Sequence, residues 1–248
     1  MSVIYILWLR ELKRYFRSRV QIVASLGQPV LYLLGLGFGM GPVFEKAGHG
    51  SYIQFVAPGI ISMTMLFSSV FSGMGLLWDR QFGFLKETLV APVPRIQIML
   101  GRTLGAATVA MFQGSLVAIV CLIAGFRPIH PGMLPLALLF MALIASLFAG
   151  VGTCIGSVLQ NMQGFQLIMN FLVLPIFFLS GALYPLSNLP VGMAVITRLD
   201  PLAYGVDAMR TTLVGISHFG LKLDAAVLIV LSVLVLWAGS RLFARIEV

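Results

Sequence analysis

The amino-acid sequence predicts an all-α membrane protein. We expect six transmembrane helices, an amphipathic interfacial helix before the first and external re-entrant helices before the last. Of the 248 residues, 59% are hydrophobic and only 10% are charged, whereas a soluble domain has about 25% charged residues. Six apolar stretches reach the roughly 20 residues that a helix needs to cross the hydrocarbon. Because they are continuously apolar, transmembrane β-strands are excluded. We expect residues 1–248 to form a single transmembrane domain.

Residues 3–17 predict a helix that lies in the membrane interface. At about 100° per residue, apolar and aromatic side chains share one face, and basic side chains that can reach anionic head groups share the other. The alternative is a basic anchor that only sets topology. A signal peptide is not expected, since the apolar run begins near Val20 and is about 20 residues long. The apolar face holds Ile4, Trp8, Leu12, Tyr15 and Phe16, and the basic face holds Arg10, Lys13, Arg14 and Arg17.

The six spans are predicted at about 20–40, 53–77, 102–126, 134–159, 165–186 and 224–243. Pro29 and the glycines at 35, 37 and 39 predict a bent or broken first helix, and Pro175 predicts the same for the fifth. Such irregularity is tolerated where neighbouring protein satisfies the freed backbone groups.

The distribution of lysine and arginine predicts that both termini are cytoplasmic. With the N-terminus inside, eleven of the 16 basic residues lie on the cytoplasmic side and five lie outside, as the positive-inside rule requires. This bias also explains the net charge of +8 without invoking nucleic acid. The inner set is Arg10, Lys13, Arg14, Arg17, Arg19, Arg80, Lys86, Arg95, Arg102, Arg241 and Arg245, and the outer set is Lys46, Arg127, Arg198, Arg210 and Lys222.

The segment from 184 to 222 is too apolar for a solvated loop and too interrupted by Pro190 and Pro201 to span the membrane. A re-entrant or surface-lying pair of helices fits it, mainly over 186–210. The alternative is an ordinary folded external loop. The candidate residues of this region are Gly181, Tyr184, Pro185, Pro190, Pro201, Tyr204, Asp207 and Arg210.

The sequence offers no catalytic, cofactor-binding or metal site. All eight acidic residues lie outside the apolar cores of the predicted spans, which disfavours ion-coupled transport. A phosphate-binding loop needs Gly-Lys followed by Ser or Thr, but each of the four lysines follows Leu or Glu. The three histidines and two cysteines show no metal spacing. We therefore expect a non-enzyme, and any ATP and Mg would bind to a separate subunit.

The charged segment DRQFGFLKETLVAPVPR, residues 79–95, lies between the second and third spans. Aromatic anchors that are buried in an interface and ringed by polar groups are typical of a strong protein interface, and the charged residues of this segment can offer directional charge pairs to a partner. The two prolines would end a helix rigidly. We therefore predict a docking helix over 79–94 rather than a solvated loop. Its candidate residues are Asp79, Arg80, Phe82, Gly83, Phe84, Lys86, Glu87, Leu89, Pro92 and Arg95.

Three blocks in order, namely residues 79–95, FFLSGALYPLSNLP at 177–190 and DPLAYGVDAMR at 200–210, resemble the permeases of the ABC-2 type. The likeness is to the branch with nodulation-factor and daunorubicin-type exporters, the six-span type V ABC exporter fold. It implies a homodimer of permeases in the bacterial cytoplasmic membrane and two separate ATPase subunits. It also implies a coupling helix at 79–94, an interfacial helix at 3–17 and a pathway between the first, second and fifth spans. The candidate lining is Tyr32, Phe38, Phe55, Phe67, Phe71, Phe165, Phe171, Phe177 and Phe178.

The sequence and the resemblance together predict the permease subunit of an ATP-driven exporter of an amphipathic drug, lipid or lipid-linked glycan. An interior without acidic residues suits a substrate whose tail stays in or near lipid. Two alternatives remain open: an ATP-independent facilitator or channel, and a membrane anchor for an ATPase that carries no substrate itself.

Overall fold

A computed structural model describes residues 2–46, 51–84, 93–186 and 189–244. These residues form helices and connecting turns and contain no strand. Six helical segments are long and apolar enough to cross a membrane, so the predicted all-α, six-span fold class is confirmed. The spans are Arg19–Phe44, Tyr52–Gln81, Arg95–Ile123, Pro131–Val158, Met162–Leu179 and Leu221–Leu242.

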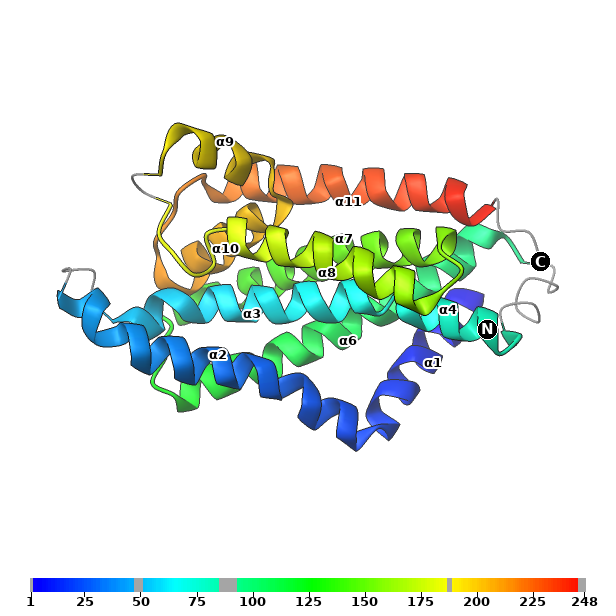
Figure 1. Cartoon of the computed structure of the whole chain (residues 1–248), viewed down its shortest axis with the longest axis horizontal. Helices are drawn as coiled ribbons and strands as arrows, with labels where there is room; N and C mark the ends of the chain where they lie inside the picture. The colour runs from blue at the N-terminus through cyan, green and yellow to red at the C-terminus, as the bar shows by residue number, and fades with distance from the viewer. Residues whose placement is uncertain (1, 47–50, 85–92, 187–188, 245–248) are drawn as a thin grey trace.

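The long helices run side by side along the long axis of the molecule (Figure 1). They are α2 (Arg19–Lys46), α3 (Tyr52–Phe71), α6 (Arg95–Ile123), α7 (Leu134–Val158), α8 (Met162–Leu179) and α11 (Leu221–Ala244). One end carries both chain termini with α1 (Val3–Arg17) and α4 (Met74–Gln81), and the other carries α9 (Val191–Leu199) and α10 (Pro201–Val214). A 3₁₀ turn, η1 (Pro131–Met133), leads into α7.

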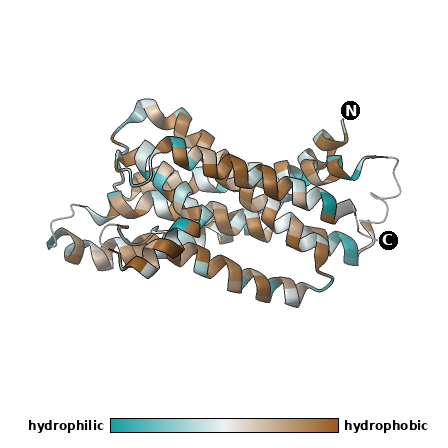
Figure 2. Cartoon of the chain, turned by 90° about the horizontal axis from the view of Figure 1, so that it is seen from above, coloured by the Kyte–Doolittle hydropathy of each residue, from teal (hydrophilic) through white to brown (hydrophobic). Residues whose placement is uncertain are grey.

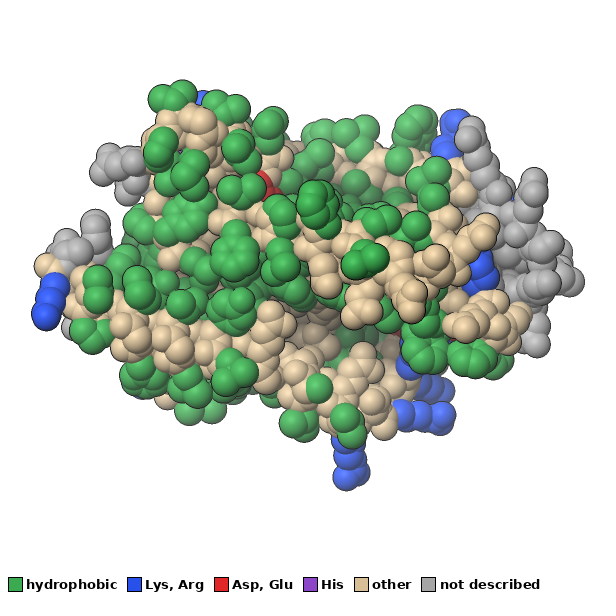
Figure 3. Space-filling model, viewed as in Figure 1, with side chains coloured by type: hydrophobic (Ala, Val, Ile, Leu, Met, Phe, Trp, Pro, Cys, Tyr) green, Lys and Arg blue, Asp and Glu red, His purple; other side chains and the backbone are tan. Residues whose placement is uncertain are grey.

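The surface of the molecule is that of a membrane protein. Hydrophobic residues dominate the long helices, and hydrophilic ones lie mostly near the helix ends (Figure 2). Apolar side chains are spread over the whole face in Figure 3, and most of its lysine and arginine side chains gather at the end that carries α1 and the termini.

The helix bounds differ from the predicted spans at several points. α6 begins at Arg95 rather than near 102, because a helix continues past the hydrocarbon as long as its residues are helix formers. α8 ends at Leu179 rather than 186, where Gly181 takes a left-handed φ of +72° and turns the chain. α2 is one continuous helix that includes Pro29 and Pro42, so the first span is not broken.

The helical break lies in the second span instead, at Ser72 and Gly73 between α3 and α4. Here the backbones of two helices touch. A Cβ on Gly73 would overlap the backbone of Gly152 in α7, and one on Gly156 would lie 2.5 Å from the carbonyl oxygen of Gly73. Small residues four apart allow this approach between membrane helices, and it fixes the second span against α7.

α3 is the central helix. Within its span, 72% of the most apolar window is buried, compared with 17% for α2 and 22% for α8. α3 contacts α2, α6, α7, α8 and α10, and its side chains Ile60, Met65 and Leu66 are fully buried. A shift of α3 would therefore reach most of the bundle, whereas α2 and α8 present broad apolar faces to lipid or to another protein.

α1 is the predicted amphipathic helix, and it docks on α6. Gly101 and Gly105 make the close contact, since a Cβ on Gly105 would lie 2.8 Å from the Cβ of Glu11. Leu7 packs with Leu76 and Ile98 beside this contact. Ile4 and Trp8, which the sequence assigns to the membrane-facing side of α1, also lie against Gly101 and Gly105, and Tyr15 is buried. That side therefore lies partly against protein.

The glycine contact predicts a measurable stability difference between two mid-span glycines. Gly152→Ala places a Cβ against the carbonyl oxygen of Val70, and such overpacking costs about 1–3 kcal/mol. Gly39→Ala in α2 meets nothing within 4 Å and should leave stability unchanged. Thermal unfolding of the purified chain in detergent measures both. Equal melting temperatures for the two variants would contradict the close packing of α7 on the second span.

Candidate functional site

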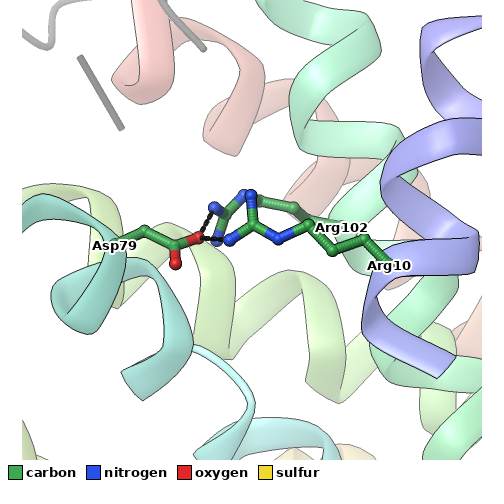
Figure 4. Close-up of polar contacts among 3 residues, drawn as sticks. All are labelled: Arg10, Asp79 and Arg102. Carbon is green, nitrogen blue, oxygen red and sulfur yellow. Dashed lines mark hydrogen bonds and ion pairs between the residues drawn. The ribbon is translucent and has the colours of Figure 1, made fainter. Parts of the chain in front are cut away.

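A buried ion cluster joins three helices at the end of the bundle that carries the termini. The carboxylate oxygen Oδ2 of Asp79, near the end of α4, accepts from Nη2 of Arg10 in α1 at 2.5 Å and from Nη2 of Arg102 in α6. Figure 4 shows the two guanidinium groups converging on this one oxygen. Asp79 and Arg102 are buried, whereas the Arg10 side chain is 36% exposed.

Burial makes this cluster rigid. A charge removed from water is stable only if it is paired, and breaking a buried pair leaves an uncompensated charge. Here one carboxylate pairs with a buried guanidinium and a partly exposed one, which leaves one net positive charge on the cluster. The neighbouring Arg80 donates to the carbonyl oxygens of Leu159 at 2.8 Å and Ser157 at 3.3 Å, which lie at the C-terminal end of α7 and need donors. α4 is thus tied to α1, α6 and α7.

The structure corrects the role predicted for the first two charges of the docking segment. Asp79 and Arg80 were expected to offer charges to a partner, but both are engaged inside the chain, because α4 continues the second span and turns them towards α1, α6 and α7. Sequence reasoning missed Arg102 as their companion. Its signal was an arginine at the very start of a predicted span, beside an apolar run that cannot hold an unpaired charge.

The segment after α4 turns outward. Phe82 and Phe84 are 62% and 53% exposed, and Trp78 stacks on Phe82 with ring centroids 5.7 Å apart. Gly83 has a φ of +82°, a conformation that glycine adopts without strain. Arg95 is the first residue of α6. Lys86, Glu87, Leu89 and Pro92 lie outside the described residues.

The basic face of the interfacial helix divides in two. Arg10 turns to Asp79, while Lys13, Arg14 and Arg17 are exposed. On the other side Trp8 donates from Nε1 to Thr108 Oγ1 of α6 at 3.0 Å. The helix is therefore held from both flanks, and its outer basic residues stay available to anionic groups.

A cavity of about 430 Å³ lies where α1 and α2 meet, between these helices and α3, α4 and α6. Figure 1 shows the α1–α2 elbow standing away from the rest of the bundle. The wall mixes amide and hydroxyl groups with aromatic rings. Its residues are Glu11, Arg14, Tyr15, Gln21, Ala24, Ser25, Gln28, Pro29, Met63, Thr64, Phe67, Ser68, Phe71, Ser72, Met74, Gly75, Trp78, Ala106, Val109 and Gln113.

The structure brings together only part of the predicted pathway lining. Phe67 and Phe71 line the cavity, with nearly parallel rings 6.2 Å apart. Tyr32 and Phe67 both contact Phe177, at 6.0 and 6.4 Å between centroids. Phe178 also contacts Phe177, with ring centroids 5.3 Å apart, although it is half exposed. The other members lie apart: Phe165 is in the core, Phe55 is at the opposite end, and Phe38 and Phe171 are exposed on α2 and α8.

At the opposite end, α9 and α10 form the helical pair predicted for 186–210, and α10 is almost wholly buried among α3, α7, α8 and α11. Arg210 donates to the carbonyl oxygen of Gly181 at 3.1 Å and lies over the Phe55 ring at 4.0 Å. Asp207 accepts from the backbone N–H groups of His218 and Phe219 at 2.7–3.0 Å. Both charges therefore hold the connections around α10.

The remaining residues predicted for this region lie in or beside α9, α10 and the turn after α8. Tyr204 donates to the carbonyl oxygen of Arg198 at 2.8 Å, and Pro201 is the first residue of α10, where its fixed φ suits a helix start. Pro190 precedes α9, and Tyr184 and Pro185 lie in the half-buried turn after α8. Among the described residues, no three His, Cys, Asp or Glu side chains lie close enough to hold a metal ion.

Comparison with known proteins decides the family. The family model described as ABC-2 type transporter matches residues 2–214. The chain belongs to the ABC-2 type transporter family. It is therefore a transport permease component and a multi-pass membrane protein, as the resemblance of its three sequence blocks implied.

Two relatives of this ABC-2 chain match nearly its whole length. Nodulation protein J of Rhizobium leguminosarum bv. viciae is 28% identical over 226 residues, covering 90% of this chain and 86% of that protein. The inner membrane transport permease YadH of Escherichia coli strain K12 is 28% identical over 237 residues, covering 94% and 92%. The ion cluster, the cavity and the α9–α10 pair therefore all lie within the region that the family shares.

The ion cluster predicts that substitutions of its three residues lower the free energy of unfolding of this ABC-2 chain by unequal amounts. Asp79→Ala leaves the buried guanidinium of Arg102 without its ion-pair partner and should lower the free energy of unfolding by about 3–5 kcal/mol. Arg102→Met should cost less than Asp79→Ala, because Asp79 keeps its pair with Arg10. Arg10→Met should cost about 1 kcal/mol or less, because Arg10 is partly in water and the Asp79–Arg102 pair survives. Chemical denaturation in detergent measures the three. An equal effect of all three would contradict the buried pairing.

Asp200, which lies outside the six spans, predicts that the stability of the fold depends on pH. Burial raises the pKa of its carboxyl to about 7, despite the hydrogen bond from Leu202 N–H that lowers it. The folded chain then binds a proton that the unfolded chain releases near pH 4, so Asp200 makes stability fall as pH rises from about 4 to 7. Asp200→Asn should flatten this part of the curve of melting temperature against pH. An unchanged curve would show that Asp200 titrates normally.

Proposed function

We propose that the chain is the permease subunit of an ATP-driven exporter in the bacterial cytoplasmic membrane. It would move an amphipathic drug, lipid or lipid-linked glycan outward, powered by a separate ABC ATPase subunit that binds ATP and Mg. The observation that carries this proposal is the ion cluster of Asp79, Arg10 and Arg102, directly before the segment predicted to dock the ATPase. Membership of the ABC-2 family supports the proposed partner.

The cluster suggests how force would travel. Phe82 and Phe84 project from the end of α4 and would insert into a cleft of the ATPase. A movement of that cleft would pull α4, and the buried ion pairs would carry α1 and α6 with it. α3, which continues into α4 with only a two-residue break, would move as well. α1, α3, α4 and α6 all border the cavity, so its shape would follow the state of the ATPase.

The proposed topology places this end of the bundle in the cytoplasm. Both termini lie at the end where most of the basic side chains gather (Figures 1 and 3), in line with the positive-inside rule. The name of the Escherichia coli relative, an inner membrane transport permease, supports the same membrane. We further propose two permease copies, facing each other through the exposed apolar sides of α2 and α8, together with two ATPase subunits.

Association with the ATPase tests the docking assignment. The double variant Phe84→Ala/Glu87→Arg should lose copurification with the proposed ABC ATPase subunit, because it removes an aromatic anchor and reverses a charge. Phe171→Ala, which removes a still more exposed phenylalanine on α8, should retain it. Unchanged copurification of the double variant would overturn the docking site.

Transport in proteoliposomes separates the proposal from its two alternatives. The complex should export substrate only with hydrolysable ATP, and the chain alone should be inactive. Movement of substrate by the chain alone would indicate a facilitator or channel. Export that is unaffected by Phe67→Ala and Gln113→Ala, but abolished by the docking variant, would indicate an anchor that carries no substrate.

A further inference from the structure

A smaller cavity lies inside the chain, beside the break between α3 and α4. It has about 10 Å³ of room for the centre of a water molecule, which is about what one water needs. A substrate would not fit into it. The side chains and backbone that surround it come from four parts of the bundle: Glu11 of α1, Ser72 and Gly73 of the break, Leu76 of α4, Arg102 of α6 and Thr153 of α7.

Arg102 brings a buried hydrogen-bond donor to this small cavity. Its Nη2 pairs with Asp79, but its Nε–H has no partner among the described residues, and the side chain is only 7% exposed. A guanidinium can only donate hydrogen bonds, and a buried donor without a partner is rare in folded proteins. An oxygen atom that accepts a hydrogen bond is therefore expected beside Nε.

Glu11 lines the same small cavity from α1. Within the described part of the chain its carboxylate accepts no hydrogen bond, and no ion pair within 4.0 Å joins it to Arg102. Asp79 with its two guanidinium groups leaves one net positive charge, which the charge of Glu11 balances. Polar groups that are separated by more than about 3.5 Å are often bridged by water, so the gap between Glu11 and Arg102 suits one water molecule.

Two hydroxyl groups complete the surroundings of such a water. Thr153 donates its proton to the Ala149 carbonyl oxygen at 2.8 Å, and Ser72 donates to that of Ser69 at 2.6 Å. Each hydroxyl oxygen can still accept a hydrogen bond. A buried water typically forms about three hydrogen bonds. Here it would accept one from the guanidinium and donate one to the carboxylate and one to a hydroxyl.

The helix break explains why a polar cavity lies at this place. The backbone hydrogen bonds there span three residues instead of four: Gly73 N–H donates to the Val70 carbonyl oxygen at 3.1 Å, and Leu76 N–H donates to that of Gly73 at 3.0 Å. Water beside a helix is one of the known causes of such an interruption. A water molecule can exchange its hydrogen bonds, so α4 could tilt against α3 without leaving Arg102 unpaired.

We propose that one water molecule binds in the small cavity and bridges Arg102 Nε to the carboxylate of Glu11. Glu11 is then the fourth member of the ion cluster, a positioning residue that acts on Arg102 through water. The four side chains of Asp79, Arg10, Arg102 and Glu11 together carry no net charge. This site needs neither a substrate nor an ATPase, so it stands or falls independently of the proposed function and can be measured on the chain alone.

Radiolytic labelling of the full chain in nanodiscs tests for the bound water. A short X-ray pulse splits water into hydroxyl radicals, which oxidise the side chains that they touch, and mass spectrometry locates the added oxygen. Leu76 lines the small cavity and Leu147 of α7 does not, although both are only 2% exposed. We expect Leu76 to be labelled severalfold faster than Leu147. Equal rates for the two leucines would overturn the proposal.

Two substitutions of Glu11 separate the hydrogen bond from the charge. Glu11→Met removes the acceptor at nearly the same side-chain length and should lower the labelling rate of Leu76 severalfold. Glu11→Gln keeps an acceptor oxygen without the charge and should leave this rate close to that of the unaltered chain. An equal loss in both variants, or no loss in Glu11→Met, would contradict the bridge. The comparison of Leu76 with Leu147 in the unaltered chain holds even if a variant does not fold.

A crystal structure of the full chain in a lipid mesophase, at a resolution that shows ordered water, tests the geometry directly. We expect one density peak within hydrogen-bond distance of both Arg102 Nε and the Glu11 carboxylate. Direct contact between Glu11 and Arg102 would overturn the proposal. So would a map that shows other internal waters but none at this site.

Discussion

The pairing of the Asp79 carboxylate with two guanidinium groups ties three helices together at the end of the bundle that carries the termini. Asp79 lies at the end of the second span, where the chain leaves the membrane, and it holds Arg10 of α1 and Arg102 of α6 at one oxygen. Separating a buried charge from its partners costs several kcal/mol. α1, α4 and α6 would therefore move together. Any force that acts on the segment after α4 would reach the interfacial helix and the third span through this contact.

Close packing of the helices would pass a movement at the ion cluster on to the rest of the bundle. α3 and α4 share the second span, and glycine backbones fix their junction against α7. α1 is fixed on α6 in the same way, through Gly101 and Gly105. Lipid gives no hydrophobic drive for helix association, so close backbone contact and internal polar bonds hold these helices. The least tightly held wall of the cavity is α2, most of which is exposed.

The features that depend on composition and on the periodicity of apolar residues could be predicted from the sequence. The six spans, the amphipathic helix at 3–17 and the helical pair at 186–210 follow from apolar length, from the two faces of a helix and from proline positions. The sequence did not predict the partners of Asp79, because pairing across three helices depends on packing that no local pattern encodes. The break at Gly73 was missed because its cause is the backbone of Gly152, almost 80 residues away in sequence. The sequence also predicted a bend or a break at Pro29, but α2 continues as one helix through this residue.

We propose that the ion cluster couples ATP hydrolysis by a partner subunit to movement of the helices that border the cavity. The direct measurement is the amount of substrate exported per ATP hydrolysed by the reconstituted complex carrying Arg10→Gln. This variant keeps the buried pair of Asp79 and Arg102, so the chain should fold and bind its ATPase. We expect ATP hydrolysis to continue while export per ATP falls severalfold, because α1 then follows α4 only indirectly, through its glycine contact with α6. An unchanged ratio in a folded, ATPase-bound complex would contradict it.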